Sequence, residues 1–180
     1  MSNLPSPGPI AVRAASEALA NVGVQEQGGN NRGQWVETYL RAVGLPPGQP
    51  WCAAFARFRY ENAAGDLDLK IPEHFPDSGW CPAFKEWAKK HDLWIPVKDV
   101  KAGEIAPAVG DMALFYFPLK QRVAHTGIVV KVAKTGVYTV EGNTGPDSGS
   151  EVQRDGDGVF RKWRSWNAFG QLGGFARIPF

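Results

Sequence analysis

Cys52 stands where a thiol can act as a nucleophile. It follows Pro50 by two residues and opens a run without proline or internal glycine that ends at Gly65, which predicts a helix over residues 52–65. At a helix start, backbone N–H groups without partners and the helix dipole favour negative charge, so they favour the thiolate, the nucleophilic form. The alternative is a small buried hydrophobic side chain, because cysteine often serves in that way.

His125 is the candidate base for this thiol. It begins the β-branched run His-Thr-Gly-Ile-Val-Val-Lys-Val, and the two-residue period of a strand places His125, Gly127 and Val129 on one face. Because Gly127 has no side chain, we expect open space there, where the start of a helix can approach the sheet. A capped histidine at the protein surface is the alternative.

The next β-rich run ends in two polar residues that suit the same site. It begins at Val137 and continues to Glu141 and Asn143, which share a face if the strand extends that far. A β-hairpin would bring Glu141 beside His125. A carboxylate bound to one imidazole nitrogen fixes the tautomer and stabilises the imidazolium, while the other nitrogen faces the thiol. Asn143 would hold the imidazole or donate to an oxyanion, although both residues are also common in turns.

A second cysteine complicates the choice of nucleophile. The segment WCPAF at 80–84 repeats the pattern of WCAAF at 51–55, and Cys81 also stands at the start of a predicted helix. Local physics therefore does not separate the two thiols. Two cysteines cannot form a disulfide framework, so reduced thiols are the expected state.

The sequence predicts no metal site and no cofactor. The side chains of the types that bind zinc and are candidates here are Cys52, Cys81, His74 and His125. No pair of them has the spacing of zinc ligands. Two pairs of aspartates are candidates for calcium: Asp66 with Asp68, and Asp155 with Asp157. Neither pair follows the pattern of a calcium-binding loop, so we expect a loop and a hairpin turn instead.

The elements that must position these residues divide into a helical half and a β-rich half. Hydrophobic residues at helical spacing predict four helices, at residues 10–22, 35–43, 52–65 and 82–91. Five short β-rich runs follow, at residues 112–117, 125–132, 137–141, 159–163 and 174–178. Helices first and strands second predict an α+β domain with a small antiparallel sheet. We expect a flexible arm at residues 1–9 and a single domain at residues 10–180.

Composition argues against several classes of protein. The 20 basic and 18 acidic residues are interspersed, so no concentrated positive charge indicates a nucleic-acid binder. No apolar stretch reaches the length of a membrane span, and no basic segment followed by an apolar run marks a secretory signal. The 43% hydrophobic content is typical of one compact core. We expect a monomer that is made in the cytoplasm.

Five short segments, in order along the chain, carry a recognisable pattern. They are GGNNRGQWVETYL at 28–40, PWCAAF at 50–55, VGDMALF at 109–115, AHTGIV at 124–129 and VEGNT at 140–144. Together they resemble the CHAP family of cysteine, histidine-dependent amidohydrolases and peptidases, which belongs to the NlpC/P60-like group of peptidoglycan hydrolases. The resemblance implies a papain-like α+β fold, in which the nucleophile's helix packs on an antiparallel sheet.

The resemblance also implies roles for single residues. In the family, the Cys of the PWCAAF segment is the nucleophile and the His that opens the HTGIV strand is the base, which are the positions of Cys52 and His125. The Glu and Asn of the last segment complete the site, at Glu141 and Asn143. On this basis Cys52 is the nucleophile of a CHAP-like catalytic domain, and Cys81 is structural.

The function implied is hydrolysis of an amide bond in peptidoglycan, between muramic acid and L-alanine or within the stem peptide, through a cysteine acyl-enzyme. We expect either a phage endolysin or a secreted antibacterial effector, and an effector implies a cognate immunity protein. Either would act on the cell wall, in the periplasm or outside the cell, after release or delivery. The alternatives are a non-catalytic module that binds the wall or a partner, and a cysteine hydrolase of other amides.

Overall fold

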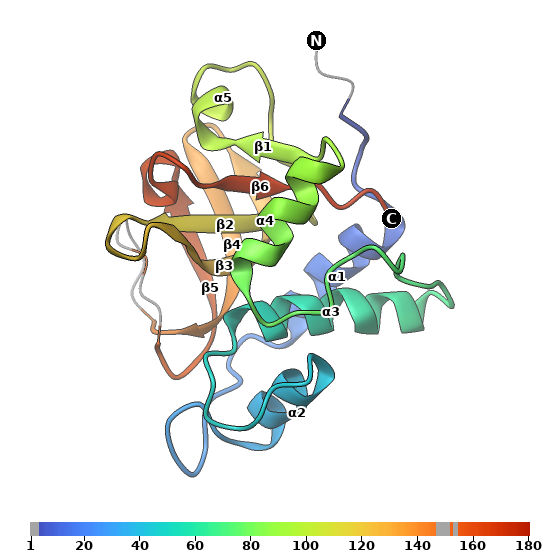
Figure 1. Ribbon diagram of the computed structural model, residues 1–180, viewed down its shortest axis with the longest axis vertical. Helices are drawn as coiled ribbons and strands as arrows, with labels where there is room; N and C mark the ends of the chain where they lie inside the picture. The colour runs from blue at the N-terminus through green and yellow to red at the C-terminus, as the bar shows by residue number, and fades with distance from the viewer. Residues whose placement is uncertain (1–3, 147–151, 153–154) are drawn as a thin grey trace.

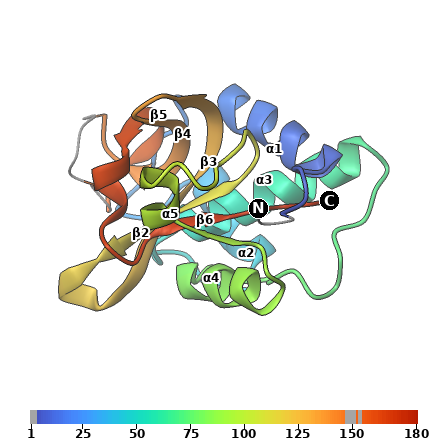
Figure 2. The ribbon, with the colours of Figure 1, turned by 90° about the horizontal axis from the view of Figure 1, so that it is seen from above.

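The molecule consists of helices packed against one antiparallel sheet. The computed structural model describes residues 4–146, 152 and 155–180. In Figure 1 the strands lie to the left and most of the helical mass lies to the right and below, and Figure 2 shows the same division from above. The predicted α+β fold is therefore confirmed.

Four helices form most of the helical part: α1 (Pro9–Ala20), α2 (Gln34–Ala42), α3 (Cys52–Asp66) and α4 (Cys81–Lys90). Each agrees with a predicted helix to within two residues at either end. Ten of the residues of α3 are buried, and they lie on all sides of the helix, as in a core element. None of the described helices is long and apolar enough to cross a membrane.

Six strands form the sheet: β1 (Trp94–Pro96), β2 (Met112–Phe117), β3 (Arg122–Ala133), β4 (Gly136–Thr144), β5 (Gly158–Ser165) and β6 (Gly174–Ala176). Their order is β1-β6-β2-β3-β4-β5, and neighbours are antiparallel. The prediction missed β1, because a three-residue strand is too short to show a two-residue period. Three single-turn helices complete the fold: α5 (Val97–Lys101), η1 (Pro118–Lys120) and η2 (Trp166–Phe169).

Alternate residues of the sheet belong to two hydrophobic clusters, as the pleat of a strand requires. The cluster that the helices cover takes Met112, Leu114, Ile128 and Val140 from the sheet. The cluster on the other face takes Ala113, Phe115, Val129 and Val137, with Phe169 and Phe175. His125 is the cross-strand partner of Phe115 and therefore shares the second face.

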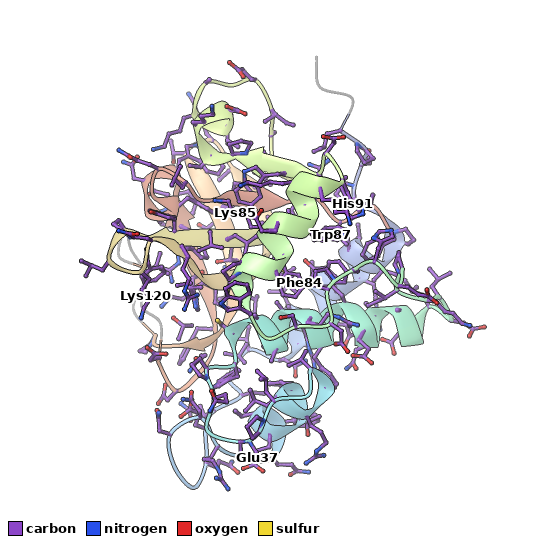
Figure 3. All side chains as sticks on the ribbon, in the orientation of Figure 1. Glu37, Phe84, Lys85, Trp87, His91 and Lys120 are labelled. Atoms are coloured by element: carbon purple, nitrogen blue, oxygen red, sulfur yellow. The ribbon has the colours of Figure 1, made fainter. Side chains whose placement is uncertain are left out.

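Contacts on both sides anchor α4. Figure 3 shows Lys85 on the side of the sheet and Trp87 and His91 on the opposite side. Lys85 Nζ donates to the carbonyl of Leu172 at 2.7 Å, and the indole N–H of Trp87 donates to His74 Nδ1 at 3.1 Å. These contacts, together with packing of α4 against β3 and β6, place its first residue beside the start of α3.

Residues 4–8 lie against the C-terminal segment. The N–H of Gly8 donates to the carbonyl of Ile178 at 2.9 Å, and the Arg177 guanidinium donates to the carbonyl of Pro5 at 2.5 Å. A Cβ at Gly8 would lie 2.3 Å from the backbone of Phe180, so only glycine allows this close approach. This part of the predicted flexible arm is thus bound to the domain, and residues 1–3 lie outside the described residues.

Candidate active site

The start of α3 is fixed by contacts from distant parts of the chain. The backbone N–H of Trp51, the residue before Cys52, donates to Asn143 Oδ1 at 3.2 Å, and the Trp51 indole donates to Glu26 Oε1 at 2.8 Å. A Cβ at Gly142 would lie 2.6 Å from the Trp51 ring. The helix start therefore packs directly on β4 because Gly142 has no side chain.

A thiol, an imidazole and a carboxylate meet at this helix start. His125 Nε2 lies 2.8 Å from Glu141 Oε2, and the Cys52 thiol is close enough to the imidazole to raise its pKa. Because Nε2 faces the carboxylate, the buried Nδ1, which has no hydrogen-bond partner among the described residues, is the ring nitrogen available to the thiol. Phe115 stacks on the imidazole with ring centroids 5.8 Å apart, which fixes the plane of the ring.

The electrostatics of this group favour charge on both His125 and Glu141. Burial lowers the pKa of His125, but the hydrogen bonds and charges of Cys52 and Glu141 outweigh burial and raise the pKa to about 9. Burial raises the pKa of Glu141, but the hydrogen bonds of Arg164 and His125 outweigh burial and lower the pKa to about 2. An imidazolium held by a carboxylate is therefore the favoured state at neutral pH.

Arg164 on β5 completes the surroundings of the carboxylate. Its Nε and Nη2 donate to the two oxygens of Glu141 at 2.8 and 2.7 Å, and Thr139 Oγ1 donates to Glu141 Oε1 at 2.6 Å. Glu141, Arg164 and Thr139 are all fully buried. A two-pronged bond between guanidinium and carboxylate is strong and directional, so Arg164 fixes both the charge and the orientation of Glu141.

Sequence reasoning missed Arg164. The only signal was the alternation of Lys162 and Arg164 in the strand over 158–165, which places two basic side chains on one face. The predicted strand ended at residue 163 and left Arg164 outside; because buried basic residues are uncommon unless they are paired, a strand longer by one residue would have indicated an acidic partner. Which partner they have depends on the β4–β5 register, which pairs Val137 with Arg164.

The space at Gly127 is used differently from the prediction. A Cβ at Gly127 would lie 2.5 Å from Cγ of Glu141, so the glycine allows the Glu141 side chain to pass across β3 toward His125. We expected the start of a helix to approach the sheet at this point. That approach occurs instead at Gly142 on β4. The space expected at Gly127 exists, but the Glu141 side chain occupies it and the start of a helix does not, so that part of the prediction was wrong.

Asn143 holds the backbone that precedes Cys52. Its Oδ1 accepts the N–H of Trp51, and its Nδ2 donates to Asn31 Oδ1 at 2.9 Å and to the carbonyl of Gly156 at 3.0 Å. Asn143 has φ of 56°, a left-handed conformation that asparagine tolerates better than most residues. None of these bonds involves the imidazole. Asn143 therefore positions the start of α3, whereas Glu141 positions His125.

A cleft of about 320 Å³ opens beside Cys52. Its walls come from the segment before α3, the approach to α4 and the start of β3, and they include Gln49, Asp77, Trp80, Cys81, Arg122 and Ala124. Asp77 and Arg122 give the cleft charges of both signs, and Trp80, which is 57% exposed, gives it an aromatic surface. Cys81 Sγ lies 3.8 Å from Cys52 Sγ.

Two of the candidate metal ligands contact other side chains. Asp66 is bound to Arg13 at 2.7 Å, and His74 stacks on His91 with ring centroids 4.6 Å apart. In the part of the chain that the structure describes, no three Cys, His, Asp or Glu side chains gather closely enough to hold a metal ion.

The fold and the site together define a class of protein: an α+β domain of papain-like architecture, with a thiol at a helix start facing an imidazole and a carboxylate on an antiparallel sheet. The family model of the CHAP domain matches residues 44–143, a range that includes Cys52, His125 and Glu141. The match covers more than half of the chain, so the chain belongs to the CHAP family, a family of peptidoglycan hydrolases and amidases. No curated protein and no solved structure matches the chain.

Proposed function

We propose that this protein hydrolyses an amide bond in peptidoglycan, with Cys52 as the nucleophile. The observation that carries the proposal is the buried chain of contacts from the Cys52 thiol through His125 to Glu141, whose last link measures 2.8 Å. A thiol, a base and an orienting carboxylate in this order are the parts that covalent acyl transfer requires.

In the first step the Cys52 thiolate attacks the carbonyl carbon of the scissile amide. The first intrahelical hydrogen bond of α3 runs from the N–H of Phe55 to the carbonyl of Trp51 at 2.8 Å, so the N–H groups before Phe55 have no acceptor inside the helix. Those N–H groups stabilise the oxyanion. The imidazolium of His125 then protonates the leaving amine, and a thioester on Cys52 remains.

In the second step water resolves the thioester. His125 is now neutral, so its Nδ1 takes a proton from the water that attacks the thioester carbonyl. The Cys52 thiolate leaves, the product departs as a carboxylic acid, and the imidazolium is restored. Throughout both steps Glu141 holds Nε2 and stabilises the charged ring, while Arg164 keeps Glu141 itself ionised.

The cleft beside Cys52 suits a short, polar peptide that carries charges. Arg122 and Asp77 can pair with a carboxylate and an amine of a stem peptide, and Trp80 gives a flat surface for a sugar or a peptide bond. Both the muramoyl–L-alanine amide and an amide within the stem peptide present such groups. The proposed reaction class therefore covers an amidase and an endopeptidase.

We further propose that the protein acts as a phage endolysin or as a secreted antibacterial effector. In either role it is made in the cytoplasm and reaches its substrate in the periplasm or outside the cell, by release or by delivery. An effector requires an immunity protein in the producing cell, and co-purification of such a protein distinguishes the two roles.

The test is hydrolysis of purified cell walls. Wild type is expected to reduce the turbidity of the suspension, and Cys52→Ala to leave it unchanged while keeping its folded structure by circular dichroism. Mass spectrometry of the soluble fragments identifies the bond by the new amine and carboxyl ends. Walls that bind the protein but stay intact would instead favour a binding module, and cleavage of simple peptides alone would favour a hydrolase of other amides.

A further inference from the structure

The second thiol of the cleft has no part in the mechanism above. Cys81 is the first residue of α4, as Cys52 is the first residue of α3, and both side chains are buried but line the same cleft. Their sulfur atoms are 3.8 Å apart, which is van der Waals contact, although the residues are 29 positions apart in the chain. Two helix starts therefore bring two thiols together at the reacting atom.

This placement sets the chemistry of the pair. The helix start and the neighbouring imidazolium favour the thiolate of Cys52, which is the form that oxidants attack. The cleft gives a small oxidant a path to that sulfur. A sulfenic acid formed on Cys52 would then lie in contact with the Cys81 thiol, the arrangement that allows condensation to a disulfide.

We propose that Cys52 and Cys81 are a modification site for hydroperoxides, at which oxidation converts the two thiols into a disulfide and reversibly blocks the nucleophile. The Cys52 thiolate attacks the peroxide O–O bond, which gives Cys52 sulfenic acid and releases an alcohol or water after protonation. The sulfur of Cys81 then attacks the sulfenic sulfur, the S–S bond forms, and water leaves with the thiol proton. The peroxide gains the two electrons that the thiols lose, and an external dithiol returns them.

The local structure allows the bond to form. The sulfurs must approach by about 1.8 Å to reach the usual disulfide length. Both residues are the first of their helices, so the change is made by side-chain rotation and a small shift of the chain before α4, where Trp80 is exposed. The strands that carry His125 and Glu141 do not have to move.

The consequence of the pair is protection as well as inhibition. A lone Cys52 sulfenic acid can react again with peroxide to give a sulfinic acid, which thiols do not reduce. Capture by Cys81 stops the oxidation at a state that a dithiol reverses. The loss and return of wall hydrolysis rest on the proposed function, but the formation of the disulfide does not.

The experiment compares the full chain as wild type, Cys81→Ser and Cys52→Ser, each treated with excess hydrogen peroxide and then with dithiothreitol. Intact mass and non-reduced peptide maps report the chemistry, and wall turbidity reports activity relative to each variant's own untreated rate. Wild type should lose two hydrogens and yield a Cys52–Cys81 cross-linked peptide. Cys81→Ser should gain two oxygens at Cys52, and Cys52→Ser should form no intramolecular disulfide.

Activity gives the second readout. Wild type should recover most of its activity after dithiothreitol, and Cys81→Ser less than about half, because sulfinic acid persists. Sulfinic acid on Cys52 in wild type as often as in Cys81→Ser, with no cross-linked peptide, would overturn the proposal. If untreated wild type does not hydrolyse walls, the proposed function fails, while the masses and peptide maps still decide whether the disulfide forms.

Discussion

The starts of α3 and α4 carry the similar sequences WCAAF and WCPAF, and in each the cysteine is the first helical residue. Their surroundings differ. Trp51 is fully buried and its backbone N–H is bound to Asn143, 92 residues away, whereas Trp80 is 57% exposed and its N–H is bound to nearby Ser78. One helix start is thus held by the sheet and the other by its own loop. The same short sequence pattern therefore has different surroundings at the start of α3 and at the start of α4.

The groups around each sulfur extend the difference. Cys52 raises the pKa of the nearby His125, and Glu141 stabilises the charge of that imidazole. Cys81 is followed by Pro82, which has no backbone N–H, so the start of α4 has one oxyanion donor fewer than the start of α3. Both thiols stand at helix starts, so the helix start does not distinguish the proposed nucleophile Cys52 from Cys81. The difference lies in the nearby imidazole and the backbone N–H donors, which tertiary packing brings together.

The largest expected effect separates the two cysteines. Cys52→Ala removes the proposed nucleophile, so wall hydrolysis should fall by about 10³-fold or more. Cys81→Ala should lose far less, because Cys81 belongs to a helix start without a base. Initial rates of turbidity loss at equal concentrations of folded protein provide the measurement. Similar losses in the two variants would remove the distinction between the two helix starts.

Substitution of Arg164 tests whether the buried contacts of Glu141 stabilise the folded domain as well as position the site. Arg164→Met leaves Glu141 buried without its guanidinium, so the free energy of unfolding should fall by about 3–5 kcal/mol. Arg161→Met on the same strand is the matched control, since Arg161 is exposed over Tyr138 and should cost about 1 kcal/mol or less. Urea unfolding measures both, and equal losses would contradict a paired, buried role for Arg164.

Substitution of Glu141 tests whether this carboxylate orients His125. Glu141→Gln should lower turnover by roughly 10²-fold, because a neutral amide stabilises the imidazolium less than a carboxylate does. His125→Ala should cost at least as much, and Glu141→Gln with His125→Ala should be little worse than His125→Ala alone if the residues act as a unit. The rates are compared on one wall preparation, at a temperature where circular dichroism shows each variant folded. Losses that multiply fully would mean that Glu141 acts elsewhere.

The two Trp N–H groups allow a direct comparison of how the helix starts are held. Asn143→Ala leaves the buried N–H of Trp51 without its acceptor and should cost about 1–3 kcal/mol of unfolding free energy. Ser78→Ala removes the corresponding acceptor of Trp80, but water can replace it at an exposed site, so the cost should be below about 1 kcal/mol. Urea unfolding midpoints of the two variants test this, and a larger loss for Ser78→Ala would reverse the comparison.

The smallest expected effect is a shift in the pH dependence of kcat/KM. The raised pKa of His125 means that the imidazolium persists at neutral pH and is lost as the pH rises through about 9. Loss of this proton donor should produce an alkaline fall in kcat/KM near that pH. Glu141→Gln should move the fall to lower pH, because the carboxylate that raises the pKa of His125 is gone. An unchanged alkaline limb in Glu141→Gln would assign it to another group.

Predictions from the sequence were good wherever a pattern is local. The four main helices follow from hydrophobic residues at helical spacing, and β2 to β6 follow from short β-branched runs between turn residues. The juxtaposition of His125 and Glu141 was also predictable, because consecutive strands usually form a hairpin. The existence of β1 and the occupant of the space at Gly127 were not predictable, since neither depends on a period that the sequence displays.

The order of residues is enough to predict a thiol at a helix start, an imidazole on one strand and a carboxylate on the next, since helix and strand periods and helix-start electrostatics act over a few residues. Three contacts could be seen only in the folded molecule: Arg164 pairs with Glu141, Asn143 holds Trp51, and Cys81 touches Cys52. Each of those contacts joins segments whose separation depends on strand register and on how α3 and α4 pack. That geometry is a property of the whole core, and no short stretch of residues encodes it.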